Sequence, residues 1–381
     1  MKEAYFNTAA TTKYKPNEVL EVLSNFYGKE FSVTGRDNHR SDNSIVEETR
    51  ELIKKLFNGN SSYGVVFTPT ATEAINIILQ GSKWTENSVL YLSPFEHNAI
   101  YRVAVMLSKK YGFNIEYLVA NKKDFTLDLE AIKYQFALKR PTFVCVSHVG
   151  NVFGNVQDIS SLGMLCANYN AKYLVDCCQS AGVLETDIVK AQADYMVFAG
   201  HKTLHSIYGC SGFVCKLNSP ILPLIYGGTG VDSASEDMPM SIPTRFEAGS
   251  MNLLAIKALN ASLKWIKSEG INCIREKEEN NLKRLHEILS SYSFIKEVGF
   301  TGNNSSIISC TVEGYSPESI GQVLAEKGIV VRTGLHCSPL AHKEAGTFPE
   351  GTVRFSIDCF TTEVDFILLS TALDDIEMEI Y

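Results

Sequence analysis

Residues 172–202, KYLVDCCQSAGVLETDIVKAQADYMVFAGHK, contain two apolar runs that decide the fold class. The first run, YLV, ends at Asp176, and the second, YMVFA, is followed directly by Gly200, His201 and Lys202. Short apolar runs rich in β-branched and aromatic residues predict buried strands. Chemically active side chains follow both strands, at the position where ligands bind in parallel α/β sheets.

The same pattern extends outward from this stretch in both directions. Strand-like runs alternate with helical patterns over most of the chain, and this alternation predicts a mainly parallel sheet in an α/β protein. Two of the predicted helices are LDLEAIKYQF and SSLGMLCANY. The other predicted elements are strands VVF at Val65, SVLYL at Ser88, IEYLV at Ile115, TFVCVS ending at Ser147 and GFVCK ending at Lys216, with helices beginning at Thr72 and Asn98.

A second, smaller unit is predicted toward the end of the chain. A passage containing several glycines and prolines, Gly227 to Pro243, interrupts the alternation. Two long helical patterns follow, at 253–267 and 271–292, and then the strand-like run SIISCTV. We predict a large domain of residues 16–250 and a small domain of residues 1–15 and 251–381.

Composition narrows the class of function. The 381 residues are 45% hydrophobic and 20% charged, as in a soluble globular protein with a sizeable core. The net charge is −8 with both signs intermixed, so no basic surface for nucleic acid or membrane is expected. No apolar run reaches the roughly 18 to 20 residues of a membrane helix, and the start MKEAYFNTAA has no signal-peptide pattern. We expect a cytoplasmic protein.

Cysteine and histidine spacing gives no reason to predict a metal. The ten cysteines include no C-x-x-C pair, and several lie in predicted core strands. The spacing of His201 and His205 mimics a zinc-protease helix, but Lys202 stands where that motif needs its glutamate. We therefore predict buried thiols and no metal site.

Lys202 is either an ordinary surface lysine or an amine that forms an imine. Asp176 favours the second interpretation, because a pyridinium nitrogen needs an anion while a lysine holds the aldehyde, and this pairing suggests pyridoxal phosphate. Ala71 and Thr72 begin a predicted helix, whose free N–H groups suit a phosphate. An ordinary N-cap is the other interpretation of Thr72.

Three further polar residues would have a functional role only next to the pyridine ring of such a cofactor. His97 is a satisfied histidine by default, or a ring that stacks on the pyridine and relays protons. Asn151 and Gln179 are either ordinary loop and helix-start residues or donors to a ring hydroxyl.

These residues lie in motifs that resemble the class V aminotransferases, and within them the cysteine desulfurase and selenocysteine lyase group. The motifs occur in order over nearly the whole chain: YFNTAATT, FTPTATEAIN, FEHNA, SHVGNVFG, VDCCQSAG, AGHK, RFEAGSMN, RTGLHC and VRFS. The resemblance implies the PLP-dependent transferase fold (fold type I), with a mainly parallel seven-stranded sheet in the large domain. It also implies a homodimer with shared active sites.

Carried over position by position, the resemblance makes Lys202 the Schiff-base lysine, Asp176 the partner of the pyridine nitrogen and His97 the stacked ring. The remaining implied roles are phosphate binding by Ala71, Thr72 and His201, contacts to the ring oxygen or substrate carboxylate by Asn151 and Gln179, and a contact from Ser250 to the phosphate of the other subunit.

Cys337 is the residue that separates a desulfurase from its relatives. It lies in a polar loop between Gly334 and Pro339, and the resemblance places the sulfur-accepting nucleophile here. Basic neighbours in sequence favour the thiolate and exposure. They are Arg332, His336 and His342.

Arg354, in VRFS, is where the resemblance puts the arginine that holds the substrate carboxylate through two parallel hydrogen bonds. A structural salt bridge is the alternative. Arg332 is expected to support the same pocket.

The resemblance implies a PLP-dependent cysteine desulfurase. L-cysteine becomes L-alanine, and the sulfur passes to Cys337 as a persulfide and on to an acceptor thiol, serving iron–sulfur clusters or other thio-cofactors. The Cys337 loop resembles that of enzymes that depend on an accessory acceptor protein. The alternatives are a selenocysteine lyase, another class V aminotransferase or lyase, and a non-catalytic scaffold. The sequence does not distinguish a desulfurase from a selenocysteine lyase, because sulfur and selenium present nearly the same shape to a pocket. The chain departs from the family pattern at Asn7–Thr8, Thr70 and Ala199.

Overall fold

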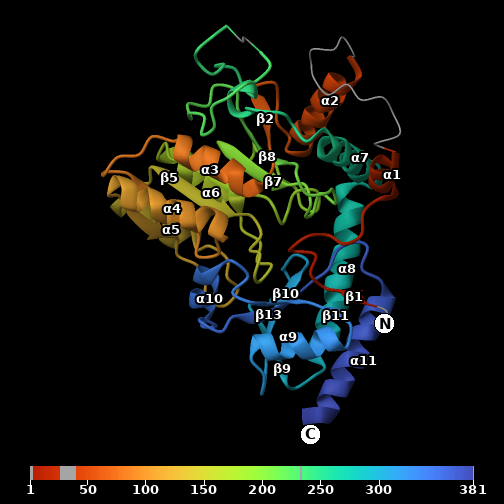
Figure 1. The fold of residues 1–381 in the computed structure, drawn as a ribbon. Coiled ribbons are helices and arrows are strands. Elements are labelled where there is room, and N and C mark those ends of the chain that lie inside the picture. The colour runs from red at the N-terminus through yellow and green to blue at the C-terminus, as the bar shows by residue number, and fades with distance from the viewer. Residues whose placement is uncertain (1–2, 26–39, 232–233, 381) are drawn as a thin grey trace.

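A computed structural model describes residues 3–25, 40–231 and 234–380. Its largest sheet has seven strands, and all neighbours in it are parallel except those of β8, which runs antiparallel to both of its partners (Figure 1). The predicted α/β class with a mainly parallel seven-stranded sheet is confirmed. In spatial order the strands are β2 (Tyr63–Thr68), β8 (Ser211–Lys216), β7 (Tyr195–Ala199), β6 (Lys172–Asp176), β5 (Phe143–Ser147), β3 (Val89–Leu92) and β4 (Asn114–Tyr117).

Helices cover both faces of this sheet, which explains why its strands are apolar runs without alternation. One face packs on α3 (Ala71–Gly81) and α4 (Asn98–Tyr111). The other face packs on α5 (Leu129–Leu138), α6 (Ile159–Asn168), α7 (Leu253–Glu269) and α2 (Arg40–Leu56).

A second core lies below the large sheet in Figure 1. Its four-stranded sheet is antiparallel throughout, and a separate two-stranded parallel pair joins the start of the chain to its last third. The order in the first sheet is β12 (Arg332–Gly334), β13 (Thr352–Ser356), β10 (Ile307–Val312) and β9 (Ile295–Val298), and the pair is β1 (Ala4–Tyr5) with β11 (Ile329–Val330). The helices of this region are α8 (Ile271–Ser290), α9 (Pro317–Glu326), α10 (Pro339–Ala345) and α11 (Glu363–Ile380).

The connection between the two cores runs from α7 into α8 through Gly270. Side chains of α7 pack on the core of the large sheet, and those of α8 pack mainly on the small core. The domain division at residue 250 stays a prediction. The remaining described helices are α1 (Asn17–Asn25) and the short 3-10 helix η2 (Thr244–Phe246).

The N-terminal segment bridges the two cores. Ala4 and Tyr5 pair with β11, while the Thr11 hydroxyl donates to the carbonyl of His201 at 3.0 Å. The Ala9 N–H donates to the Ser356 hydroxyl at 3.0 Å. Residues 4–12 therefore contact both the loop after β7 and the small domain. Among the helices described, none has the length and apolarity needed to cross a membrane.

Candidate active site

Asp176 lies at the carboxyl end of β6, next to the end of β5. It is 8% exposed, accepts a hydrogen bond from the Cys178 N–H at 2.9 Å, and has no cationic partner in the described part of the chain. Such a carboxylate is suited to a cationic ring nitrogen supplied from outside the protein.

Glu96, which the sequence analysis did not select, is a second acid near Asp176. It accepts hydrogen bonds from the Ser147 N–H at 2.8 Å and from the Ser147 hydroxyl at 2.9 Å. Burial raises the pKa of Glu96 to about 8, and the negative charge of Asp176 contributes. Glu96 therefore keeps its proton at neutral pH. Its sequence signal is an acid directly before His97, in a motif that follows a fully apolar strand.

His97 is the N-cap of α4, and its Nδ1 accepts the N–H of Ala99 at 3.0 Å. This acceptor role leaves the proton of the neutral ring on Nε2. Burial lowers the pKa of His97 to about 4, and the nearby Lys202 charge acts in the same direction. The imidazole is therefore neutral and held in one orientation at the edge that carries Lys202.

Lys202 and His201 follow β7 at the same edge of the sheet. The His201 ring stacks on Tyr208 at 4.4 Å between ring centroids, and its Nδ1 is buried without a partner. Burial lowers the pKa of His201 to about 4, so the imidazole ring is neutral at pH 7. It is available to a bound group.

The α3 N-terminus differs in one detail from the sequence-based interpretation. Thr70, not Thr72, is the N-cap, because the Thr70 hydroxyl accepts the N–H of Glu73 at 3.1 Å. The ordinary N-cap interpretation of Thr72 is therefore wrong. The first-turn N–H groups of Ala71 and Thr72 have no acceptor within the helix and favour an anion.

The Cys337 loop is tied to the large domain on both sides of the sulfur. The Asn151 amide donates to the His336 carbonyl at 2.8 Å, and its oxygen accepts from the Ser338 hydroxyl at 2.7 Å. The Asn98 N–H donates to the Cys337 carbonyl at 2.7 Å. Asn151, predicted to contact the ring or substrate, thus uses both ends of its amide on this loop.

The loop backbone is strained at Cys337. His336 and Cys337 both lie in the left-handed region, with φ of 48° and 60°. Left-handed backbone is costly for residues other than glycine and is kept where surrounding contacts enforce it. Gly351 supports the same loop, because a side chain there would meet the Gly334 carbonyl oxygen at 2.2 Å.

Of the three basic residues expected near Cys337, only Arg332 contacts the sulfur. Its Nη2 lies 3.2 Å from Sγ. His336 and His342 are buried instead, and burial lowers the pKa of both rings, that of His342 to about 4. Their hydrogen bonds go to threonines. Of these three residues, Arg332 is therefore the one that brings positive charge to the sulfur, and the Arg354 guanidinium also interacts electrostatically with Cys337.

Arg354 pairs with Arg332 across strands β13 and β12. Its Nη1 donates to the Asn151 carbonyl at 2.7 Å, its Nη2 donates to the Asn7 Oδ1 at 3.2 Å, and its buried Nε has no partner. No acid faces it within residues 3–25, 40–231 and 234–380, so the structural salt-bridge alternative is wrong. Burial lowers the pKa of Arg354 to about 9.

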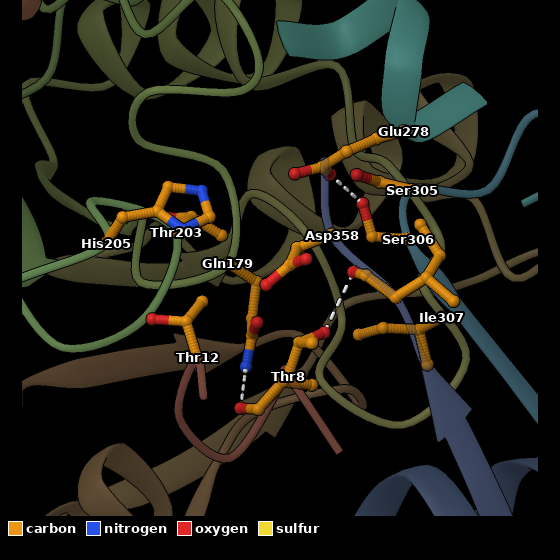
Figure 2. Close-up of a pocket in the computed structure, with 12 residues that line it drawn as sticks. Thr8, Thr12, Gln179, Thr203, His205, Glu278, Ser305, Ser306, Ile307 and Asp358 are labelled. Carbon is orange, nitrogen blue, oxygen red and sulfur yellow. Dashed lines mark hydrogen bonds between the residues drawn. The ribbon is translucent and has the colours of Figure 1, made fainter. Parts of the chain in front are cut away.

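Two predicted residues lie outside this group. The Gln179 amide donates to the Ala9 carbonyl at 2.8 Å, and its side chain lines a small cavity behind the N-terminal segment (Figure 2). Ser250 is exposed before α7 and has no hydrogen-bond partner among the described residues. Its predicted contact with a second subunit remains a prediction.

Comparison with known proteins places this arrangement in context. The family model "Aminotransferase class-V" matches residues 4–369. A probable cysteine desulfurase from Methanothermobacter thermautotrophicus is 28% identical over 99% of this chain and 95% of its own length. A cysteine desulfurase from Synechococcus elongatus is 30% identical over 98% of this chain and 60% of its own length. The apo structure of a cysteine desulfurase from Thermococcus onnurineus NA1 superposes with a TM-score of 0.89 at 25% identity, covering 98% of this chain and 94% of that chain.

Proposed function

This chain belongs to the class-V aminotransferase family and is an enzyme of its cysteine desulfurase group, and we propose that it uses pyridoxal phosphate to convert L-cysteine to L-alanine. In this proposal Cys337 takes the sulfur as a persulfide. The observation that carries it is the half-buried Cys337 thiol, 3.2 Å from the Arg332 guanidinium in a strained loop tied to the large domain.

The residues present fit pyridoxal phosphate. Asp176 is a buried acid without a cationic partner among the residues that the structure describes, and His201 has a buried nitrogen without a described partner. The first turn of α3 offers free N–H groups to the phosphate, and the Lys202 amine is placed to hold the aldehyde. When bound, the cofactor supplies an electron sink for the charge that develops at the substrate Cα.

Lys202 and His97 handle protons in this proposal. The Lys202 Nζ would hold the cofactor aldehyde and, as a free amine, would accept the Cα proton of the substrate. His97 is neutral with its proton on Nε2, so that nitrogen faces the site as a donor while Nδ1 stays fixed on the Ala99 N–H. Asn151 holds the loop with one amide hydrogen and one acceptor site, and its second amide hydrogen would bind the ring oxygen or the substrate carboxylate.

Arg354 binds the substrate carboxylate in this scheme. An arginine has five N–H donors, and the protein uses one on Asn151 and one on Asn7, while Nε has no partner. A carboxylate therefore finds unused donors on a buried guanidinium that has no acidic partner of its own.

The sulfur step uses the Cys337 thiolate. A bond forms between the two sulfur atoms as the substrate Cβ–S bond breaks. The electron pair of that bond stays with Cβ, which is protonated to become the methyl group of alanine. A thiol acceptor then removes the outer sulfur by thiol exchange. Arg332 stabilises negative charge on the Cys337 sulfur before and after transfer.

The rest of the proposal concerns partners. It includes a homodimer in which Ser250 reaches the phosphate of the other subunit, and an accessory protein as sulfur acceptor. The exposure of Ser250 supports the first. A cytoplasmic location stays part of the prediction from sequence.

The test is incubation of the purified protein with pyridoxal phosphate, a reductant and L-cysteine, following sulfide and alanine together. We expect equal amounts of both products, loss of both in Cys337→Ser, and full activity in Cys273→Ser, which changes an exposed cysteine elsewhere. Undiminished activity in Cys337→Ser would contradict the proposal. Parallel assays with L-selenocysteine separate the lyase alternative, which predicts selenide with little sulfide.

A further inference from the structure

A small polar cavity lies between the two domains, behind the N-terminal segment. Its volume is about 20 Å³, enough for one water molecule or one metal ion. Figure 2 shows three elements meeting there: the segment that carries Thr8 and Thr12, the loop with His205, and the small domain with Glu278 and Asp358. The side chains of His205, Glu278 and Asp358 converge on the same space.

The donor atoms in this region are those that zinc prefers. His205 Nε2 lies 3.9 Å from the Cys359 Sγ, and one ligand atom each from His205, Glu278 and Cys359 lies within 4.8 Å of the others. Standard zinc bond lengths in a tetrahedral site separate a nitrogen from a sulfur by about 3.5 Å. Small side-chain adjustments would therefore bring the three groups to a common ion.

One buried atom points independently to a missing ligand. Asp358 Oδ2 has no hydrogen-bond partner, although Asp358 is 3% exposed. Buried polar atoms in native proteins nearly always have a partner. Asp358 lines the cavity together with His205 and Glu278, so an ion bound there would meet it.

Glu278 is the buried carboxyl group of this cluster and has no basic partner among the described residues. Glu278 is 4% exposed, and its partner is the Ser306 hydroxyl rather than a basic group. Lys15 interacts electrostatically with Asp358, but no salt bridge to Glu278 occurs among the described residues. A buried carboxylate is stable only when it is paired, protonated or bound to metal. A divalent ion held by one thiolate, one carboxylate and a neutral imidazole forms a neutral unit.

We propose that His205, Glu278 and Cys359 form a divalent-metal site of the zinc type. Asp358 or a water completes the coordination. Binding replaces the protons of the Cys359 thiol and the Glu278 carboxyl group, which are released to solvent, and involves no change in oxidation state. No metal was expected from the sequence, because it has no C-x-x-C pair and Lys202 interrupts the motif formed by His201 and His205. In the structure His201 stacks on Tyr208, and His205 is directed into the cavity.

The proposed site joins the two domains. His205 lies three residues after Lys202, whereas Glu278 lies on α8 and Cys359 follows β13. Bound zinc would therefore fix the loop of the Schiff-base lysine against the small domain that carries Cys337. Its effect is expected on domain stability rather than on the reacting atoms.

The test uses the full chain loaded with pyridoxal phosphate and carrying Cys337→Ser, so that the catalytic thiol binds no metal. After removal of metal by a chelator, Zn²⁺ is added and bound zinc is measured by equilibrium dialysis and mass spectrometry. We expect one zinc per chain. Absorption at the zinc edge should show one sulfur at about 2.3 Å with nitrogen and oxygen ligands at about 2.0–2.1 Å.

Substitution of the ligands provides the contrast. Even second-shell changes weaken metal binding about 10- to 100-fold, so Cys359→Ser and Glu278→Gln should each weaken it by about 100-fold or more. Cys273→Ser, a matched change of an exposed cysteine, should have no effect. The proposal is overturned if the parent chain retains no stoichiometric zinc, if its spectrum lacks sulfur, or if Cys359→Ser binds zinc as tightly as the parent. Because the first two outcomes need no further variant, misfolding of a variant does not remove the test.

Discussion

Two buried polar regions of the molecule lack a counter-charge for different reasons. Around Cys337, Arg332 and Arg354 face each other without an acid in the described chain. Behind the N-terminal segment, burial raises the pKa of Glu278 to about 8 and of Asp358 to about 6, so Glu278 keeps its proton at neutral pH in the absence of a cation. The cationic region fits a substrate carboxylate and a thiolate, and the acidic region fits a metal ion. The first region is cationic without a ligand, whereas the buried acid of the second is neutralised by a proton until a ligand binds.

The largest effect is expected from removing the Arg354 guanidinium, which has no acidic partner among the described residues. Arg354→Gln keeps a hydrogen-bonding side chain but loses the guanidinium, and with it two charge-assisted bonds to substrate worth about 1.5–3 kcal/mol each. We expect kcat/KM for L-cysteine to fall by about 10²- to 10⁴-fold. Steady-state kinetics on cofactor-loaded enzyme measure this. An unchanged kcat/KM would mean that Arg354 is structural.

Glu96 is a third case to compare with the two regions, because this buried acid keeps its proton and needs no ligand. Its folded-state pKa of about 8 lies above the ordinary value of 4.5, so its favourable contribution is complete below pH 4.5 and is lost as pH rises through 8. Glu96→Gln should therefore match the parent near pH 4.5 and be more stable by a few kcal/mol at pH 9, since one pKa unit equals about 1.4 kcal/mol. Urea denaturation at both pH values measures the difference. Parallel pH profiles of the two proteins would refute this role.

A substitution at Asn151 tests whether its hydrogen bonds position the Cys337 loop. Asn151→Ala removes two hydrogen bonds to the Cys337 loop, and we expect kcat to fall by about tenfold because the sulfur is no longer positioned. Ser338→Ala removes only one of the two bonds and should have a smaller effect. Single-turnover rates at saturating cysteine report the difference. Equal effects of the two substitutions would argue against a positioning role.

The smallest expected effect concerns Arg332 and the sulfur. Arg332→Gln removes the charge 3.2 Å from Sγ, and we expect alkylation of Cys337 by iodoacetamide at pH 7 to slow by about threefold to tenfold. Cys273 in the same sample serves as the internal control, because it lies elsewhere and is exposed. Mass spectrometry of the labelled peptides gives both rates. A faster reaction at Cys337 would show that Arg332 shields the thiol instead.

The large sheet was predictable because its strands are buried on both faces. Predicted ends at Ser147, Asp176 and Ala199 agree with β5, β6 and β7. Each strand is a continuous apolar run closed by a polar or glycine residue, so its end can be read locally. The same local pattern placed Asp176 and Lys202 at one edge.

The charge balance around each ligand site was not predictable from sequence. His336 and His342 were expected to be charged neighbours of Cys337, but burial makes them neutral, and burial of a loop depends on contacts with distant segments. His205 and Cys359 are 154 residues apart and meet only through packing of the two domains. Glu96 was missed because its partners are brought together by the sheet.

The N-terminal segment has a consequence for synthesis. Residues 4–9 pair with residues 329–356, which are made long after them. Contacts between such distant parts of a chain slow its folding. A growing chain therefore contains Lys202 long before it contains Arg332, Cys337 and Arg354. During synthesis, the N-terminal segment has no partner in the small sheet until these later strands are made.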